Sequence, residues 1–208
     1  MQISSRYKQR LLVIIGIIFC IVLSQTTTYP NTDLSIQIST PRKTYTHALT
    51  PHIPIVISHD DDFESLGFEG NGTEVSPYLI EDLSISIDGS SETICIKIVS
   101  TSSYFIIRNC ELSSSDPQSG TGIYLEKVVN GRVENCSFNT LVLGIWALKS
   151  QECVLLNSTI NNLSTGIYIT QSSWFSVVSN EISGCKYGLH LYKMDYSSLV
   201  GNIINDCD

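Results

Sequence analysis

Four residues with ring side chains recur in the last third of the chain at a constant interval of 22 residues: Tyr124, Trp146, Tyr168 and His190. If equivalent positions stack, these four residues form a flat strip, called the aromatic strip below. Its apolar faces suit sugar rings and its polar edges suit sugar hydroxyl groups. Aromatic residues also favour strands and stabilise cross-strand pairs without any ligand. The sequence leaves both interpretations open, and carbohydrate binding is the function it indicates.

A second aligned set of side chains lies three positions beyond each ring: Lys127, Lys149, Gln171 and Lys193. Ammonium and amide groups donate hydrogen bonds to hydroxyl groups, and ammonium groups also pair with the carboxylates of acidic sugars. We therefore expect Lys127, Lys149 and Lys193 to belong to the same ligand-binding surface as the aromatic strip.

The positions of the rings follow a repeat that is marked by glycines at 122, 144, 166 and 188, without an insertion. A fixed period of this length indicates stacked supersecondary units. Apolar residues alternate within each unit, as at Ile123 and Leu125, and a period of two indicates β-strands. The sequence thus predicts an all-β fold, a right-handed single-stranded parallel β-helix of about five coils of this repeat with an N-terminal cap.

The N-terminus has the pattern of an export signal. Three basic residues precede the apolar run Leu11–Leu23, after which the chain becomes polar. This run is short for a membrane-spanning helix, which needs about 20 residues. We predict a signal peptide or signal anchor at 1–25, which exports the chain to the cell surface and is its only contact with a membrane.

The rest of the chain divides into a Thr/Ser/Pro-rich linker at 26–50, a solenoid cap at 51–77 and the repeats at 78–208. In the cap, Ile53–Ser58 is predicted as a strand and His59–Glu74 as a polar loop, and Pro77–Ile85 is predicted as the strand that starts the stack.

The coil before Gly122 is five residues longer than the regular repeat, and four of these extra residues lie in a turn-rich excursion at Ser113–Thr121. The chain stops before the next expected corner, which favours a short or truncated chain, or an end-to-end contact that covers the last coil.

Export bears on the cysteines, because disulfides persist in oxidising compartments. Cys110 and Cys136 occupy equivalent positions, and so do Cys185 and Cys207. Stacked residues in neighbouring strands lie about 4.8 Å apart, within the Cα range that a disulfide tolerates. Two disulfides are therefore predicted, and a reduced cysteine ladder inside the core is the alternative.

Asparagines suggest two different roles. Asn71 and Asn162 begin sequons and are the predicted glycosylation sites of an exported chain. Other asparagines align between coils, where their side chains could hydrogen-bond along the stack and satisfy turn backbone groups. These aligned pairs are Asn135 with Asn157 and Asn180 with Asn202.

Catalytic and metal-binding patterns are weak. The dense acidic group Asp60, Asp61, Asp62 and Glu64 is the candidate calcium site, although a short acidic run is usually a solvated loop. No two carboxylates of the repeats share a column, whereas a hydrolase needs a pair of them. We therefore expect a binding protein that is not an enzyme. With 12 basic and 20 acidic residues, nucleic acid is an unfavourable partner.

The pattern G-I-x-L…I/V-x-N…I, preceded by HIPIVIS…DFESLGFEGNGTEVSPYLIEDLSI, resembles the NosD-like, carbohydrate-binding-and-hydrolase type of secreted β-helix proteins that are common in archaea. The resemblance covers roughly residues 51–208. It implies a sugar-binding surface protein, with two alternatives: a polysaccharide lyase or glycoside hydrolase, here as a fragment, or an accessory protein for copper-site maturation. Copper needs soft or imidazole ligands, and the four histidines and two methionines show no ligand spacing.

Overall fold

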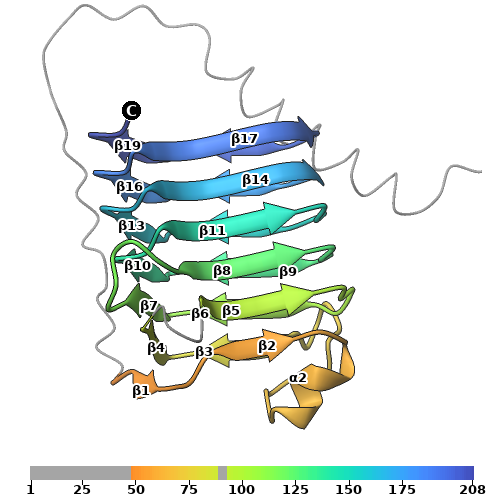
Figure 1. The fold of residues 1–208 in the computed structure, drawn as a ribbon. Coiled ribbons are helices and arrows are strands. Elements are labelled where there is room, and N and C mark those ends of the chain that lie inside the picture. The colour runs from red at the N-terminus through yellow and green to blue at the C-terminus, as the bar shows by residue number, and fades with distance from the viewer. Residues whose placement is uncertain (1–47, 89–92) are drawn as a thin grey trace, which may run out of the picture. The chain divides into compact units, whose positions relative to one another are not determined.

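The computed structural model describes residues 48–88 and 93–208, so the predicted signal segment and most of the predicted linker lie outside the described residues. The described chain contains one short helix, α2 (Asp61–Ser65), and 19 strands in three parallel sheets. The successive coils lie one above another in Figure 1. No helix among the described residues is both long and apolar enough to cross a membrane.

Each sheet takes one strand from every coil. The first sheet, A, contains β1 (Thr50–Pro51), β4 (Leu83–Ile87), β7 (Glu111–Ser114), β10 (Ser137–Asn139), β13 (Thr159–Asn161), β16 (Glu181–Ser183) and β19 (Ile203–Asn205). Sheet B contains β2 (Ile55–Ile57), β5 (Ile94–Val99), β8 (Thr121–Glu126), β11 (Leu143–Leu148), β14 (Thr165–Ser173) and β17 (Tyr187–Asp195). Sheet C contains β3 (Tyr78–Glu81), β6 (Phe105–Arg108), β9 (Gly131–Glu134), β12 (Val154–Leu156), β15 (Ser176–Val178) and β18 (Ser198–Val200).

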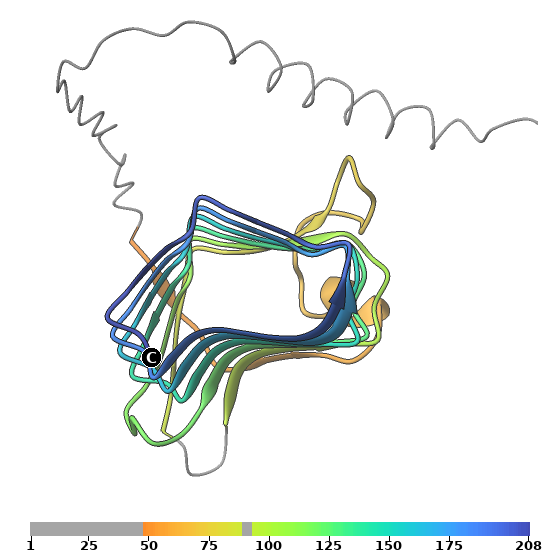
Figure 2. The ribbon, with the colours of Figure 1, turned by 90° about the horizontal axis from the view of Figure 1, so that it is seen from above.

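The chain passes from sheet B to C to A and then rises to the next coil. Viewed along the stack, the coils superpose as one closed outline (Figure 2). The predicted parallel β-helix is confirmed, and its first coil takes β2 from the predicted cap and β3 and β4 from the predicted repeats. The predicted register is confirmed as well, since Ile145 of β11 lies between Ile123 and Ile167.

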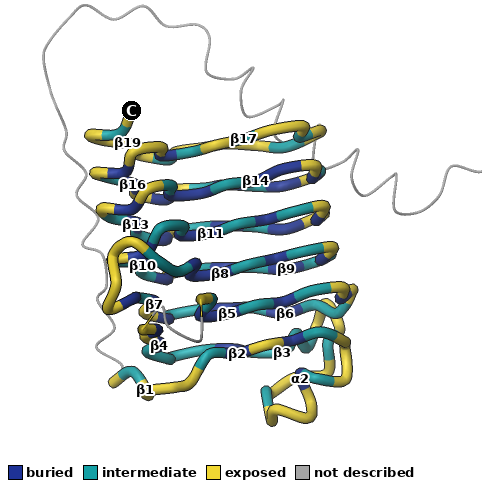
Figure 3. Tube along the Cα trace, viewed as in Figure 1, coloured by how far each residue is buried: buried dark blue, intermediate teal, exposed yellow. Residues whose placement is uncertain are grey.

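Alternate side chains of each strand point inward and form the core. Ile123, Leu125, Val133 and Phe138 are all fully buried within a single coil. The buried residues follow one another from coil to coil in Figure 3. The last coil differs, because Leu199 and Ile204, which occupy core columns, are 45% and 43% exposed.

The corners between the sheets are made by residues in the left-handed conformation. After the strands of sheet C, this position is held by Asp82, Asn109, Asn135, Asn157, Ser179 and Gly201, with φ between 49° and 65°. Asn, Asp and Gly tolerate this conformation better than other residues do. The aligned Asn135 and Asn157 therefore suit the corner backbone, and in this column the Asn109 side chain donates to Asp82.

The repeated glycines are required by close contact between coils. A Cβ atom on Gly144 would lie 2.5 Å from the carbonyl oxygen of Gly166, and one on Gly166 would lie 2.6 Å from that of Gly188. Real Cβ atoms do not approach so closely, and neither glycine has a positive φ. The 22-residue glycine signal thus reflects steric exclusion rather than backbone freedom.

A ladder of polar side chains runs inside the corner between sheets C and A. The Asn180 Oδ1 atom accepts from the backbone N–H of Ser158, and Asn180 Nδ2 donates to Leu155 O and to Asn202 Oδ1. Asn202 Oδ1 also accepts from the backbone N–H of Asn180. Asn180 is 1% exposed. The predicted Asn180–Asn202 ladder is confirmed, and it satisfies backbone groups at the corner where no strand can pair them.

Two features near the N-terminus differ from the sequence prediction. Pro77–Ile85 is not one strand, because Asp82 with φ 56° bends it into β3 and β4. The predicted loop His59–Glu74 contains helix α2, whose Phe63 is fully buried and stacks 4.7 Å from Tyr78. A single apolar side chain in a polar run gives no periodic signal, which is why the helix was missed.

We predict that Gly144→Ala lowers the free energy of unfolding by about 1–3 kcal/mol, the usual cost of inserting an atom into a packed region. Urea denaturation measures this change. Cys95→Ala is the matched control, because Cys95 holds the same column of sheet B and already carries a Cβ. An equal loss in both variants would contradict the steric argument.

Asn180→Ala should destabilise the fold by about 1–3 kcal/mol, because a buried backbone N–H then loses its acceptor. Asn180→Ser should recover part of that loss, since Ser158 holds the same column one coil earlier. Thermal denaturation of the two variants against the parent compares them. Equal stability of Asn180→Ala and the parent protein would refute a structural role for the ladder.

Candidate functional site

The candidate site lies on the outer face of sheet B, where the register of the strands brings the aromatic strip together. Trp146 of β11 is directly paired with Tyr124 of β8 and with Tyr168 of β14. Tyr168 is paired in turn with His190 of β17. The column continues downward to Lys97 of β5, which pairs with Tyr124. The strip thus crosses four coils as an unbroken row.

The rings of the strip touch one another but do not form the flat surface that we expected. Tyr124 and Trp146 meet edge to face, with centroids 4.8 Å apart and planes at 67°. Trp146 and Tyr168 are more nearly parallel at 26° and 6.1 Å, and Tyr168 meets His190 at 66° and 4.8 Å. His190 is exposed and the other three rings are half-buried. The strip is corrugated because each ring packs against the next.

The Trp146 indole carries an unsatisfied donor. Its Nε1 atom is the one buried side-chain polar atom among the described residues that has no hydrogen-bond partner. Such an atom costs about 1–3 kcal/mol unless another group satisfies it, and unsatisfied groups of this kind call for an explanation. It lies in the middle of the strip, between the rings of Tyr124 and Tyr168.

One end of the strip has a polar partner that the sequence did not reveal. The Tyr124 hydroxyl group donates a 2.9 Å hydrogen bond to Glu126, two residues further along β8. Burial, together with this hydrogen bond to a carboxylate, raises the pKa of Tyr124 to about 12. Tyr124 is therefore neutral at physiological pH, and its hydroxyl hydrogen is held by Glu126.

The lysines lie beside the strip at the bend that follows sheet B. Lys127, Lys149 and Lys193 all have φ of 51–52° and are exposed. Lys127 Nζ lies 3.8 Å from a Glu126 carboxylate oxygen, and Lys193 Nζ lies 5.2 Å from the centroid of the Tyr192 ring. Each of the three lysines thus follows a ring of the strip by three residues on its own coil, and their binding role stays a prediction.

The acidic group of the cap makes structural hydrogen bonds. Asp62 Oδ2 accepts from the backbone N–H groups of Ser58 and His59, and these bonds lower its pKa. Asp60 accepts from the Thr101 hydroxyl group. Among the described residues, no group of three His, Cys, Asp or Glu side chains could hold a metal ion. Calcium at Asp60, Asp61, Asp62 and Glu64 stays a prediction that receives no support here.

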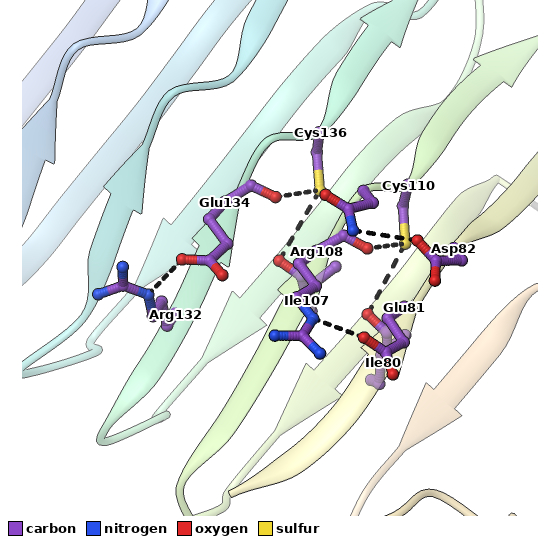
Figure 4. A network of polar contacts seen from close by, with 10 residues as sticks. Ile80, Glu81, Asp82, Ile107, Arg108, Cys110, Arg132, Glu134 and Cys136 are labelled. Atoms are coloured by element: carbon purple, nitrogen blue, oxygen red, sulfur yellow. Dashed lines mark hydrogen bonds and ion pairs between the residues drawn. The ribbon is translucent and has the colours of Figure 1, made fainter. Parts of the chain in front are cut away.

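The outer face of sheet C carries a network of opposite charges (Figure 4). Arg108 Nε lies 2.5 Å from Glu81 Oε2, and Arg132 Nε lies 2.6 Å from Glu134 Oε2. Our statement that no two carboxylates share a column is wrong once the first coils are included, because Glu81, Arg108 and Glu134 form one column. Each of the two carboxylates is paired with its own guanidinium group, Glu81 with Arg108 and Glu134 with Arg132, whereas a hydrolase needs one carboxyl group as an acid and the other as a base or nucleophile.

The four cysteines of the predicted disulfides are free thiols in the structure. Cys110 and Cys136 occupy adjacent coils, and their side chains are in hydrogen-bond contact. Each of these thiols also lies 3.3 Å from a backbone carbonyl oxygen two residues before it. Cys185 and Cys207 form the second contacting pair. Both disulfides stay predictions, because the pairs are adjacent and only their oxidation state distinguishes the alternatives.

The two preferred sequons are accessible. Asn71 is exposed and its Oδ1 atom accepts from Thr73 Oγ1 at 2.7 Å, within the sequon itself. Asn162 is exposed at a left-handed corner with φ 59°. Glycosylation at both positions stays a prediction.

A second aromatic pair was missed by the sequence reasoning. Trp174 and Tyr196 follow β14 and β17 at the corner toward sheet C, and their rings stack with centroids 4.7 Å apart and planes at 12°. The two residues are 22 positions apart, so the repeat already contained the signal. It was overlooked because the equivalent residues of earlier coils, Asn130 and Glu152, have no ring.

The three parallel sheets, the one-to-one coil register and a ligand-sized surface strip define this molecule as a parallel β-helix repeat protein. A family model described as periplasmic copper-binding protein (NosD) matches residues 56–208, which is more than half of the chain. The chain therefore belongs to the NosD family. Neither the comparison with curated proteins nor that with solved structures found a match.

The family description names copper, so we compared it with the side chains present. Copper sites in proteins use imidazole, thiolate or thioether ligands in a defined geometry. Among the described residues, no group of three His, Cys, Asp or Glu side chains could hold a metal ion. His190 lies on β17, whereas His52 and His59 lie in the loops before and after β2. The His and Cys side chains that the structure describes therefore do not assemble a copper centre of this kind.

Burial raises the pKa of Cys95 and of Cys153 from 9.0 to about 12. Because both folded-state values are raised, the stability linked to these thiols is complete below about pH 9 and is lost as pH rises toward about 12. We expect urea unfolding to show decreasing stability across this range. Cys95→Ala combined with Cys153→Ala should reduce the decrease, and an unchanged pH dependence in that variant would contradict the assignment.

Proposed function

We propose that this protein is an exported binding module that recognises carbohydrate through the aromatic strip. The observation that carries the proposal is the unbroken row of rings from Tyr124 to His190, on four neighbouring strands of one rigid sheet. Sugar-binding surfaces combine apolar ring faces with convergent hydrogen-bonding groups. The aromatic strip supplies the ring faces. Its polar border, which consists of Glu126, Lys127, Lys149 and Lys193, supplies the hydrogen-bonding groups.

The polar border supports a hydroxyl-rich ligand over a purely apolar one. Glu126 at one end accepts hydrogen bonds, and Lys127, Lys149 and Lys193 donate them. A ligand without hydroxyl groups would displace the water molecules that hydrogen-bond to these side chains and would offer no hydrogen bonds in return. Each polar group buried in this way costs about 1–3 kcal/mol. The lysines also favour saccharides that carry carboxylates, because ammonium groups pair with carboxylates. They place positive charge beside the strip of a protein whose net charge is negative.

The geometry favours a chain of sugars over a single one. The four rings lie on four neighbouring strands, and each strand is about 4.8 Å from the next. The row of rings is therefore longer than one pyranose ring. A ring pair meeting edge to face also creates a notch rather than a platform. We infer that successive sugars of an oligosaccharide occupy successive notches along the stack.

Export follows from two independent signals. The basic and apolar pattern before residue 25 is typical of a secretory signal or anchor, and the matching family is described as periplasmic. We therefore propose that the module acts at the cell surface or in a periplasm-like compartment, where polysaccharides are accessible. A lyase or hydrolase activity is not proposed, because the carboxylates nearest the strip are not paired.

Trp146→Ala should lower the affinity for a bound oligosaccharide at least tenfold, which corresponds to about 1.4 kcal/mol. The reason is that Trp146 contacts both neighbouring rings, so its removal interrupts the strip at the centre. A glycan array on residues 48–208 identifies the ligand, and isothermal titration calorimetry then measures the affinity of each variant.

Two controls accompany this experiment. Trp146→Phe keeps an aromatic ring and should retain most of the affinity. Arg132→Ala changes a residue on sheet C, away from the strip, and should leave binding unchanged. If the parent protein binds no glycan, or if Trp146→Ala binds as tightly as the parent, the proposed function is wrong.

A further inference from the structure

The corner that follows sheet B holds two large aromatic residues in the left-handed conformation. Trp174 and Tyr196 have φ of 57° and 51°. Bulky residues rarely adopt this left-handed conformation, whereas asparagine adopts it readily. Asn130 holds the equivalent position with φ 67°. Glu152 holds it in the next coil with φ 52°, and the two coils after that place large aromatic residues at the same left-handed corner.

Burial does not explain this replacement. Trp174 is 48% exposed and Tyr196 is 76% exposed. Their rings stack on each other outside the core, while the adjacent inward column is filled by the fully buried Phe175. Residues held in an unfavourable conformation and left exposed indicate function rather than packing.

The backbone connects this pair rigidly to the aromatic strip. β14 and β17 are nine residues long, and their pairing continues past the bend to Ser173 and Asp195. The Trp174 N–H then donates to the Asp195 carbonyl oxygen at 3.0 Å. Tyr168 and Trp174 are six residues apart, which corresponds to roughly 20 Å at most. The two aromatic clusters are thus held at a fixed separation on the same two coils.

The surface between the clusters is polar. Gln171 and Lys193 are exposed at the bend, and Tyr192, which precedes Lys193 on β17, is exposed as well, whereas Thr170 is buried. Hydroxyl groups of a ligand would satisfy these side chains, whereas an apolar partner would leave their polar atoms without hydrogen bonds. A saccharide chain matches both the rings at the ends and the polar groups between them.

We propose that Trp174 and Tyr196 form a second saccharide subsite, which binds a distal part of the same polysaccharide chain that occupies the aromatic strip. This inference rests on the proposed function. It specifies a long ligand: a disaccharide fills one cluster only, whereas an octasaccharide reaches both. Joining two subsites on one ligand raises the affinity without any new contact at either one.

The chain has only two tryptophans, one in each cluster, and each therefore reports on its own subsite by fluorescence. In Trp146→Phe, the remaining Trp174 should change its emission with an octasaccharide and not with the matching disaccharide. In Trp174→Phe, the remaining Trp146 should respond to both. The probes are cello-, chito- and galacturonate oligosaccharides of the two lengths.

The outcomes separate this inference from the proposed function. If Trp146 responds and Trp174 responds to neither length, the second subsite is wrong and the strip stands. If Trp174 responds equally to both lengths, it is an independent site, and the shared chain is wrong. If neither tryptophan responds to any oligosaccharide, the proposed function fails together with the inference.

A stability measurement tests whether the pair is merely structural. Trp174→Asn relieves the unfavourable backbone, so its Tm should equal or exceed that of the parent, while its affinity for the octasaccharide falls at least fivefold. Ser179→Asn is the matched control, because it places asparagine at another left-handed corner with φ 53° and removes no ring. A fall in Tm for Trp174→Asn with unchanged octasaccharide affinity would assign the pair to the fold alone.

Discussion

The hydrogen bonding of parallel strands at a single register governs this structure. Each coil is bonded to the next through all three sheets, so residue n of one regular coil lies beside residue n + 22 of the next. A parallel pair fixes this relation because a slip by one residue would turn every inward side chain outward. The core columns, the corner residues and the aromatic strip all follow from that one relation.

The constraint explains why chemically different residues recur as columns. Glycine repeats at 144 and 166 because the coils approach too closely there for a Cβ atom. Asparagine repeats at 180 and 202 because a side-chain oxygen must accept the backbone N–H that the corner removes from strand pairing. Neither requirement concerns a ligand. The outward columns are free of such requirements, so the residues there are left to cross-strand packing and to the ligand binding that we propose.

Outward columns can serve function because the stack holds them rigidly. Side chains on neighbouring strands lie at a fixed spacing, so a row such as Tyr124 to His190 is organised before any ligand arrives, which limits the entropic cost of binding. The strip is not ideal in shape, since the rings tilt against one another. That tilt stabilises the row and at the same time produces the notches that we assign to sugars.

The sequence by itself determined the architecture and the composition of its columns, because a repeat of constant length states which residues are neighbours. It therefore specified the strands of the regular coils, the Asn180–Asn202 ladder and the row of rings, whereas the glycine expected at a corner, Gly122, lies inside β8. The tertiary structure decided what periodicity does not encode: the bend at Asp82, the helix around Phe63, the tilt of the rings, and the ion pairs Arg108–Glu81 and Arg132–Glu134. These features depend on side-chain packing in the irregular coils and on backbone dihedral angles, and neither repeats along the chain.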